Sequence, residues 1–431
     1  MKVFVMNWKR QISMAEEAES IREVVNQMSN LDKKWHRETL AVHAGSGPEE
    51  GSVSLVRPVQ MSASFELPEF GPELFDALLL ESDQPPHAYT RWSNPSVRSL
   101  EEKLAALEGA EAALVTASGM AAVSAVVLGM LEKGDHLIAQ EICYVGSQEL
   151  FGEYLGKYGI EVSLVDTSDL AQIDEAMKSN TRMIYAETPA NPILRIADVA
   201  ALAAIAKKSG AKLVIDSTYA TPALQRPLEL GADLVIHSLT KFINGHGDAL
   251  GGAVLGSMEQ IKHLRKSMLV HLGGAASPFN AWLIARGALT LPLRMEKHCA
   301  NAAALAAFLE SHRSIERVFY PGLPSHPHHH IASRQMSAYG GMLTFVLKDG
   351  MAAAIKMAER IKVFTYATSL GHPHSLIFYY PTDLYIDQIA YLSPEQKEKV
   401  RTDWMGEGIV RVSAGLENSD DLIKDLENAL V

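Results

Sequence analysis

Short apolar runs alternate with helical patterns through the middle of the chain. The β-branched runs at residues 213–215 and 234–236 are typical of strands that are buried on both faces of a sheet. Asn94 and Pro95 offer an N-cap followed by proline at the first helical position, which predicts a helix start. The pattern predicts strands at 112–116, 135–140, 161–165, 182–187, 213–216, 234–238 and 253–255, with helices beginning at Gly119, after Gly146, near 170–177 and across 199–208. Such alternation predicts an α/β fold with a mostly parallel sheet and helices on both faces.

The two ends of the chain do not follow this alternation. Residues 1–35 carry apolar side chains at helical spacing among acidic ones, which predicts a helical extension packed on its own subunit or on a neighbour. Residues 43–95 are rich in Gly, Pro and Ser without periodicity, and long irregular segments of compact proteins tend to be functional. Past residue 292, a long helix at 293–311, a strand near 342–347 and a helix at 352–361 predict a smaller α+β domain. The expected divisions are an extension and arm (1–93), a large domain (94–292) and a C-terminal domain (293–431).

Composition narrows the class of protein. The 431 residues are 47% hydrophobic and 21% charged, as in ordinary globular proteins. A net charge of −12 argues against nucleic acid or an anionic membrane as the partner. Because Cys143 and Cys299 are the two cysteines, no disulfide framework is expected. The apolar run at residues 1–8 is too short for a signal peptide, and we expect a cytoplasmic protein without membrane spans.

Lys241 and Asp216 follow two of the predicted buried strands. Lys241 lies just past the end of the strand at 234–238, where α/β enzymes bind ligands and where a desolvated amine becomes a neutral nucleophile. Asp216 ends the preceding strand and offers a carboxylate to a pyridinium nitrogen, while Ser238 and Thr240 offer hydroxyls to a phosphate. This combination is the pattern of pyridoxal phosphate (PLP) enzymes. Taken alone, Lys241 is more often a solvated strand end and Asp216 a turn residue, but the pair favours catalysis.

Two further segments offer phosphate ligands. Ser118, Gly119 and Met120 lie between a strand and a helix, where backbone amides and the helix dipole favour an anion. The alternative is an ordinary glycine turn. Tyr89 and Arg91 lie in the irregular segment, where a planar guanidinium and a phenol suit phosphate. The alternative is a pair of surface residues.

Other side chains suit a flat cofactor or a substrate carboxylate. Tyr144 follows a strand end, so its ring either stacks on a cofactor or lies at an interface. Asn191 is either a ligand or a turn residue. Arg411 interrupts an apolar strand-like run, so either a substrate carboxylate or an internal salt bridge must pair with it. The histidines within residues 326–330 lie among prolines without helical spacing, which favours a solvated loop, and we expect no metal site.

These residues belong to longer blocks that identify a family. From about Leu40 to the end, the chain resembles the Cys/Met-metabolism PLP enzymes, which include cystathionine γ-synthase, cystathionine and methionine lyases and homoserine sulfhydrylases. The blocks are Tyr89-Thr90-Arg91-Trp92-Ser93-Asn94-Pro95, Ala117-Ser118-Gly119-Met120-Ala121-Ala122, Glu187-Thr188-Pro189-Ala190-Asn191-Pro192, Asp216-Ser217-Thr218-Tyr219-Ala220-Thr221-Pro222, His237-Ser238-Leu239-Thr240-Lys241-Phe242, Leu293-Arg294-Met295 and Val410-Arg411-Val412-Ser413-Ala414-Gly415-Leu416-Glu417. Their number leaves little room for another family.

The resemblance implies PLP fold type I, the aspartate-aminotransferase-like fold, and homotetramers built from catalytic dimers. It implies that Lys241 bonds covalently to PLP and moves protons, and that Asp216 pairs with the ring nitrogen. Tyr144 would stack on the ring and act as acid to the leaving sulfur. Arg411 would bind the substrate carboxylate beside Ser369, with Asn191 near that carboxylate or the ring hydroxyl. The phosphate would be held by Ser118, Gly119, Met120, Ser238 and Thr240, joined by Tyr89 and Arg91 from the partner subunit.

The resemblance does not fix the reaction. We expect a carbon–sulfur lyase that acts on methionine, cystathionine, homocysteine or cysteine by γ- or β-elimination to a 2-oxo acid, ammonia and a thiol. The alternative is γ-replacement on an activated homoserine. Gly247-Asp248 resembles the methionine γ-lyase form, but Gly146 stands where that enzyme usually has cysteine. The segment from His372 through the aromatic residues 378–380 also departs from relatives, and either lines the substrate entrance or forms a differently packed loop.

Overall fold

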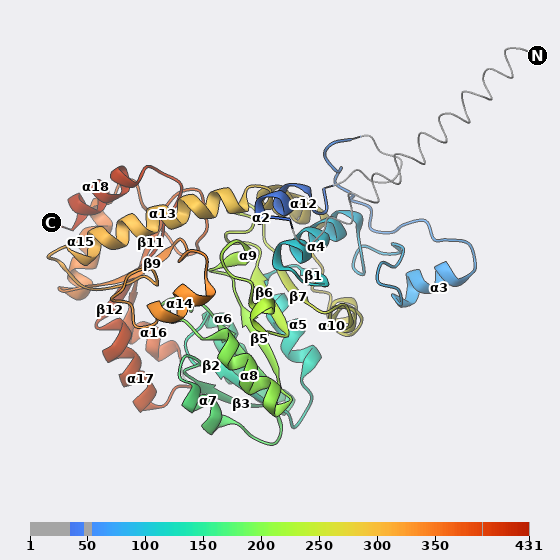
Figure 1. The fold of residues 1–431 in the computed structure, drawn as a ribbon, viewed down its shortest axis with the longest axis horizontal. Helices are drawn as coiled ribbons and strands as arrows, with labels where there is room; N and C mark the ends of the chain where they lie inside the picture. Colours follow the sequence, from blue (N-terminus) through green and yellow to red (C-terminus); the bar gives the residue numbers. More distant parts are fainter. Residues whose placement is uncertain (1–34, 47–53, 390, 431) are drawn as a thin grey trace, which may run out of the picture.

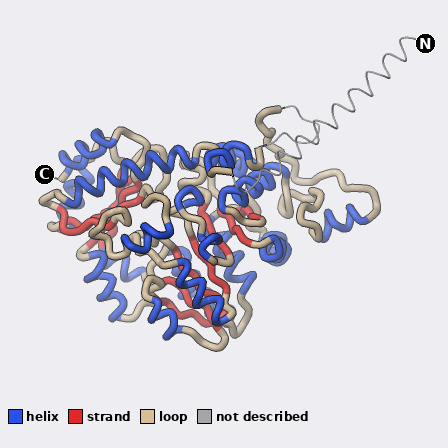
Figure 2. Tube along the Cα trace, viewed as in Figure 1, coloured by secondary structure: helices blue, strands red, loops and turns tan. Residues whose placement is uncertain are grey.

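A computed structural model describes residues 35–46, 54–389 and 391–430, so the helical extension predicted for residues 1–35 lies outside the described residues except for Trp35. The described chain contains two sheets with helices packed against them (Figures 1 and 2). No helix among these residues is long and apolar enough to cross a membrane.

The large sheet has seven strands in the order β1-β7-β6-β5-β4-β2-β3. Neighbouring strands are parallel from β6 through β3, whereas β7 runs antiparallel to both β1 and β6. The predicted mostly parallel sheet is therefore confirmed. Its strands are β1 (Ala112–Thr116), β2 (His136–Gln140), β3 (Glu161–Val165), β4 (Thr181–Glu187), β5 (Lys212–Asp216), β6 (Leu234–Ser238) and β7 (Gly252–Gly256).

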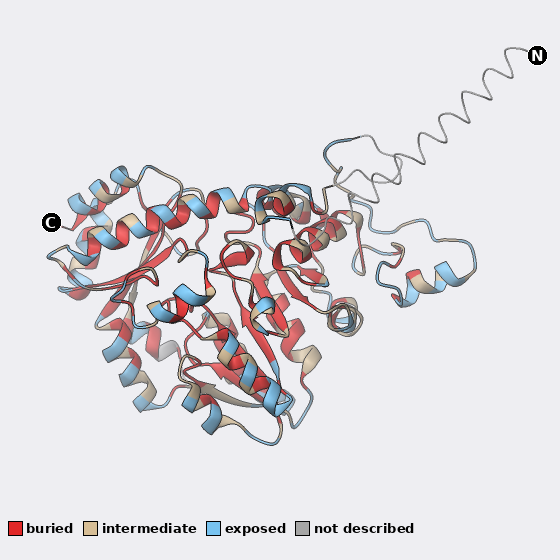
Figure 3. Ribbon diagram, in the orientation of Figure 1, coloured by how far each residue is buried: buried red, intermediate tan, exposed pale blue. Residues whose placement is uncertain are grey.

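Helices cover both faces of this sheet, as its two-sided apolar strands require. Tyr185 and Val214 pack in the same apolar cluster as α5, whereas their neighbours Ile184 and Ile215 pack with α8. Figure 3 shows the resulting buried strands between helices whose outer sides are exposed. The helices around this sheet are α4 (Pro95–Glu108), α5 (Gly119–Met130), α6 (Val145–Glu149), α7 (Leu170–Ala176), α8 (Val199–Ser209), α9 (Thr221–Leu224), α10 (Met258–Leu264), α11 (Val270–Leu272) and α12 (Pro278–Ala288).

Local sequence signals set several helix starts. Asn94 caps α4 by accepting a hydrogen bond from the Ser96 amide, and Pro95 occupies the first position, as predicted. Ser118 caps α5 by accepting from the Ala121 amide. Short π-helical and 3-10 turns at Leu150–Tyr154 and Leu155–Tyr158 extend the helical segment that follows Gly146.

A second, separate sheet has five strands in the order β10-β11-β12-β9-β8. One of its faces packs on α13, α15 and α18, and α13 continues from there into the core beside the large sheet (Figure 1). Residues 376–381 are strand β11, so the loop considered for the aromatic segment is wrong. The elements are β8 (Ile315–Phe319), β9 (Met342–Leu347), β10 (Thr365–Tyr366), β11 (Leu376–Pro381), β12 (Gly408–Ser413), α13 (Leu291–Glu310), α14 (His329–Gln335), α15 (Gly350–Arg360), α16 (Thr382–Gln388), α17 (Pro394–Val400) and α18 (Ser419–Ala429).

Residues 43–95, which were predicted to be irregular, contain helix α3 (Pro72–Leu79), and helix α2 (Arg37–His43) ends where that segment begins. Gly71 and Pro72 start α3, and Leu80 ends it in the left-handed conformation. The helix lies away from the body of the molecule with exposed apolar side chains (Figures 1 and 3). Eight residues are too few for hydrophobic periodicity to stand out beside so many turn residues.

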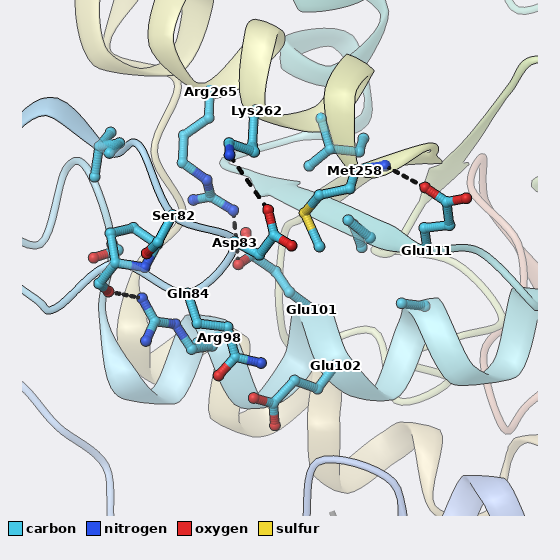
Figure 4. A pocket seen from close by; sticks show the side chains of 17 residues that line it. Ser82, Asp83, Gln84, Arg98, Glu101, Glu102, Glu111, Met258, Lys262 and Arg265 are labelled. Carbon is cyan, nitrogen blue, oxygen red and sulfur yellow. Dashed lines mark hydrogen bonds and ion pairs between the residues drawn. The ribbon is translucent and has the colours of Figure 1, made fainter. Parts of the chain in front are cut away.

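A charged cavity marks where the segment after α3 meets the core (Figure 4). Lys262 of α10 lies 3.3 Å from the Asp83 carboxylate, and Arg265 lies 2.8 Å from the Glu101 carboxylate. Arg98 donates to the Pro85 carbonyl at 2.5 Å. These contacts hold the segment that follows α3 against α4 and α10, and the cavity lies between them.

Candidate active site

The carboxyl ends of β4, β5 and β6 meet at one edge of the large sheet, where α/β proteins bind ligands. A cavity of about 220 Å³ lies at this edge. Its lining includes most of the side chains that the sequence analysis singled out, namely Ser118, Gly119, Met120, Tyr144, Asn191, Asp216, Ser238, Thr240 and Lys241. The fold therefore gathers residues from five separate segments of the chain into one site.

Lys241 lies in the turn that follows β6, with its side chain partly buried. Its Nζ donates a hydrogen bond to Ser369 Oγ at 2.9 Å. Burial lowers the pKa of this amine, and the charge of Arg411 lowers it further. Both effects favour the neutral amine, which is the form that attacks a carbonyl or accepts a proton.

Asp216 ends β5 and is almost fully buried. Thr218 donates to Asp216 Oδ1 through its amide at 3.0 Å and its hydroxyl at 2.6 Å, and the Tyr185 hydroxyl donates to Oδ2 at 3.3 Å. Burial raises the pKa of Asp216 despite these bonds. Because a buried carboxylate needs a positive partner and the described residues form no ion pair with Asp216, a pyridinium nitrogen fits this position.

The N-terminus of α5 and the end of β6 form an anion seat at the cavity. The first amides of a helix have no intrahelical acceptor, so those of Gly119 and Met120 are available to an anion. A Cβ atom on Gly119 would lie 3.0 Å from Ser238 Oγ, so any side chain would crowd this seat. Thr240 Oγ1 accepts from the Gly251 amide at 3.2 Å. Amides, hydroxyls and the absence of a side chain at residue 119 fit a phosphate group.

Tyr144 lies at the start of α6 with 46% of its surface exposed. Its backbone amide donates to Glu187 Oε2 at 2.9 Å. A Cβ atom on Gly146 would lie 2.8 Å from Cε1 of the Tyr144 ring. The lack of a side chain at Gly146 therefore lets the Tyr144 ring lie over the start of its own helix.

Arg411 of β12 reaches toward the large sheet and is buried. Its Nη1 donates to Asn191 Oδ1 at 2.7 Å and its Nη2 donates to the Ser369 carbonyl at 3.0 Å. The Tyr219 hydroxyl also donates to Asn191 Oδ1, at 2.6 Å. The internal salt bridge considered for Arg411 is not found among the described residues, since its partners are neutral. The guanidinium thus remains available to a substrate carboxylate.

Aromatic rings surround the charge on Arg411. Its guanidinium lies 5.1 Å from the centroid of the Tyr380 ring. Burial lowers the pKa of Arg411, but Tyr219 and Tyr380 outweigh that effect and leave the pKa above its usual value. Phe378 contacts Tyr380 at 4.9 Å between centroids, so the aromatic segment of β11 extends outward from the arginine.

Tyr89 and Arg91 do not line this cavity. Arg91 stacks on the Tyr89 ring at 5.5 Å and donates to the Val270 carbonyl. Their contribution from a partner subunit therefore stays a prediction.

The histidine cluster is partly buried. His326 is 2% exposed and lies 6.1 Å from the Trp404 ring, so the solvated loop predicted for residues 326–330 is wrong there. Within the described ranges, no group of histidine, cysteine and acidic side chains could hold a metal ion.

Glu187 and Tyr219 line the cavity but were missed as site residues. Both lie in the family blocks quoted from the sequence. Glu187 also ends a predicted buried strand, as Asp216 does, and that position was the signal that could have identified it.

A mostly parallel sheet whose strand ends carry Lys241 and a buried Asp216 beside an anion seat defines a fold-type-I PLP enzyme. The crystal structure of metB from Corynebacterium glutamicum matches with a TM-score of 0.82 and 35% identity, over 93% of this chain and 99% of that chain. The family model for Cys/Met metabolism PLP-dependent enzymes matches residues 38–431. The chain belongs to this family, which confirms the predicted family, fold and cofactor.

Curated relatives cover most of the chain. L-methionine gamma-lyase of Pseudomonas putida is 42% identical over 91% of this chain and 96% of its own length. Canavanine gamma-lyase of Rhizobium leguminosarum bv. trifolii is 42% identical over 91% of this chain and 95% of its own. O-succinylhomoserine sulfhydrylase of Pseudomonas aeruginosa is 43% identical over 80% of this chain and 84% of its own.

Proposed function

We propose that this protein is a PLP-dependent carbon–sulfur lyase that releases a thiol, ammonia and a 2-oxo acid from a sulfur amino acid. The observation that carries the proposal is the placement of the Lys241 amine, the Asp216 carboxylate and the anion seat around one cavity. The similarity to L-methionine gamma-lyase over 91% of this chain supports elimination as the reaction.

Residues of this chain hold the cofactor and move the substrate proton. When bound, PLP supplies an aldehyde that bonds amines and a ring that accepts the electron pair left by loss of a proton. Asp216 keeps the ring nitrogen charged, and the α5 amides with Ser118, Ser238 and Thr240 hold the phosphate. Lys241, whose pKa is lowered by burial, holds the cofactor and moves the proton at the substrate α-carbon.

Three other residues place the substrate. Arg411 binds its α-carboxylate, with the Asn191 amide and Ser369 beside it. The Tyr144 phenol donates a proton to the leaving sulfur. Tyr144 lines the cavity, and its bond to Glu187 is made by the backbone amide and not by the phenol. Met120, Val123, Leu250 and Leu370 give the cavity an apolar wall that suits a thioether side chain.

The assembly is part of the proposal. Tyr89 and Arg91 lie on an arm whose α3 exposes Phe75, Leu78 and Leu79, and burying such side chains against a second copy would be favourable. We place Tyr89 and Arg91 at the phosphate of the partner subunit, in a homotetramer of catalytic dimers. The divisions at residues 93 and 292 separate this arm, the cofactor domain and the C-terminal domain. The free, buried Cys143 and Cys299 agree with a reducing cytoplasm.

The similarity to O-succinylhomoserine sulfhydrylase supports one alternative, γ-replacement. A substrate panel separates the two reactions. Purified protein with PLP is given methionine, homocysteine, cystathionine, cysteine or canavanine, each with and without O-acetyl- or O-succinylhomoserine, while 2-oxobutyrate, pyruvate and thiol are followed. Oxo acid from sulfur amino acids alone supports the lyase. Product only when an activated homoserine meets a thiol contradicts it.

A further inference from the structure

Glu187 is a buried carboxyl group at the cavity for which the proposed reaction has no assigned use. It ends β4 and is 4% exposed. In the sheet register, Glu187 pairs with Asp216 at the end of β5, so two carboxyl groups lie side by side behind the cavity. Burial, together with the charge of Asp216, raises the pKa of Glu187 to about 8. Burying an ionisable group costs free energy, so the contacts of Glu187 should offset that cost.

The two oxygens of Glu187 accept hydrogen bonds from two different segments. Oε2 accepts from the Tyr144 amide at 2.9 Å, and Oε1 accepts from the Asn191 amide at 2.6 Å. Tyr144 begins α6 after β2, whereas Asn191 follows β4. One side chain therefore ties together the backbones that carry the ring and the amide on either side of the cavity.

The contacts continue from Asn191 into the second sheet. Asn191 Oδ1 accepts from Arg411 at 2.7 Å and from the Tyr219 hydroxyl at 2.6 Å. A shift of the Asn191 backbone would carry this acceptor away from Arg411. Glu187 is therefore placed to control the orientation of the Tyr144 ring and the alignment of the carboxylate-binding arginine without contacting the reacting atoms.

We propose that Glu187 is a positioning residue whose carboxyl group fixes the Tyr144 ring for stacking and the Asn191–Arg411 pair for substrate binding. This inference rests on the proposed PLP enzyme. Glutamine keeps the size of the side chain but offers one acceptor oxygen, so Glu187→Gln gives up one of the two amide bonds. Active sites lose function when such supporting contacts loosen.

The test compares Glu187→Gln with Glu141→Gln. Glu141 is equally buried at the end of the neighbouring strand, but it pairs with Arg195 at 2.9 Å and does not line the cavity. Two readouts are taken on PLP-loaded protein without turnover: the visible circular dichroism of the cofactor, which reports ring stacking, and the Kd for L-norleucine, which reports carboxylate binding. The melting temperature without PLP reports general stability.

We expect Glu187→Gln to change the cofactor dichroism or to raise the Kd for norleucine roughly tenfold, the effect of one lost hydrogen bond. Glu141→Gln should lower the melting temperature and leave both readouts at wild-type values. If Glu187→Gln folds and matches wild type in both, the inference is wrong.

A second variant covers a failure to fold. Glu187→Asp keeps the carboxyl group but is one methylene too short to reach both amides, so the same changes are expected from it. If neither Glu187 variant folds while Glu141→Gln does, Glu187 is a core residue and the positioning role is refuted. If wild-type protein binds no PLP, it is the proposed function that fails, which the absorbance of wild type shows independently.

Discussion

Replacing Arg411 by lysine isolates what a guanidinium contributes to this site. The Arg411 side chain makes two bonds in different directions, at 2.7 Å to Asn191 Oδ1 and at 3.0 Å to the Ser369 carbonyl, and Asn191 lines the cavity. Lysine keeps the charge but is a single point donor, so it cannot hold both neighbours and bind a carboxylate with two parallel bonds.

The structure sets the size of the effect. A bond to a charged group contributes ~1.5–3 kcal/mol, and at least one such bond to the substrate is lost in Arg411→Lys. A loss of about 2 kcal/mol corresponds to roughly thirtyfold in kcat/KM. We expect most of it as a higher KM, because carboxylate binding is shared by ground and transition states.

The assay is steady-state production of 2-oxo acid from the substrate that the panel identifies. Arg401→Lys is the matched control, since Arg401 pairs at 2.7 Å with Asp383 on the surface and should leave KM unchanged. An unchanged KM in Arg411→Lys, in protein that retains its PLP absorbance, would refute carboxylate binding by Arg411.

Four further changes test other parts of the account. Gly119→Val should weaken PLP binding at least tenfold, measured by dialysis and absorbance, because its Cβ would lie 3.0 Å from Ser238 Oγ; unchanged retention would exclude this phosphate seat. Arg195→Met should cost about 3–5 kcal/mol in urea unfolding, because it leaves the buried Glu141 and Asp166 carboxylates unpaired; a loss below 1 kcal/mol, roughly that of a surface pair, would contradict this. Burial lowers the pKa of His326 from 6.5 to about 3, so below pH 6.5 the unfolded chain binds more protons than the folded one and stability falls as pH falls. His326→Phe should reduce that loss by up to ~2 kcal/mol at about pH 5. Parallel plots of stability against pH for the variant and the wild type would count against this. Arg91→Ala should loosen PLP, and mixing it with Lys241→Ala protein should restore some active sites; no recovery in exchanged hybrids would argue against an arm that crosses subunits.

The sheet and the residues on it could be predicted from sequence because the signals are local. Every predicted strand of the large sheet appears within one residue of its expected ends, since short β-branched runs such as 213–215 are typical of strands buried between helices. Strand-end chemistry then follows from topology, which is why Lys241 and Asp216 meet at the same cavity.

What the sequence did not show depends on tertiary contacts. The burial of His326 against Trp404, from a segment far along the chain, leaves no local pattern. Glu187 looks like any strand-end acid until the fold brings the Tyr144 and Asn191 amides to its two oxygens. Strand β11 was ambiguous because its aromatic residues 378–380 do not alternate with polar ones. Tyr379 packs in the core of the second sheet, whereas Tyr380 contacts Arg411 on the other side of the strand.

Locating the cofactor on the chain tests the role of Lys241 most directly. PLP-loaded protein is reduced with borohydride, digested and mapped by mass spectrometry, with Lys241→Ala treated in parallel. We expect a single pyridoxyl group on Lys241, none in the variant, and loss of turnover in the variant although it remains folded. A pyridoxyl group on another lysine, or normal turnover by Lys241→Ala, would contradict the assignment of this site.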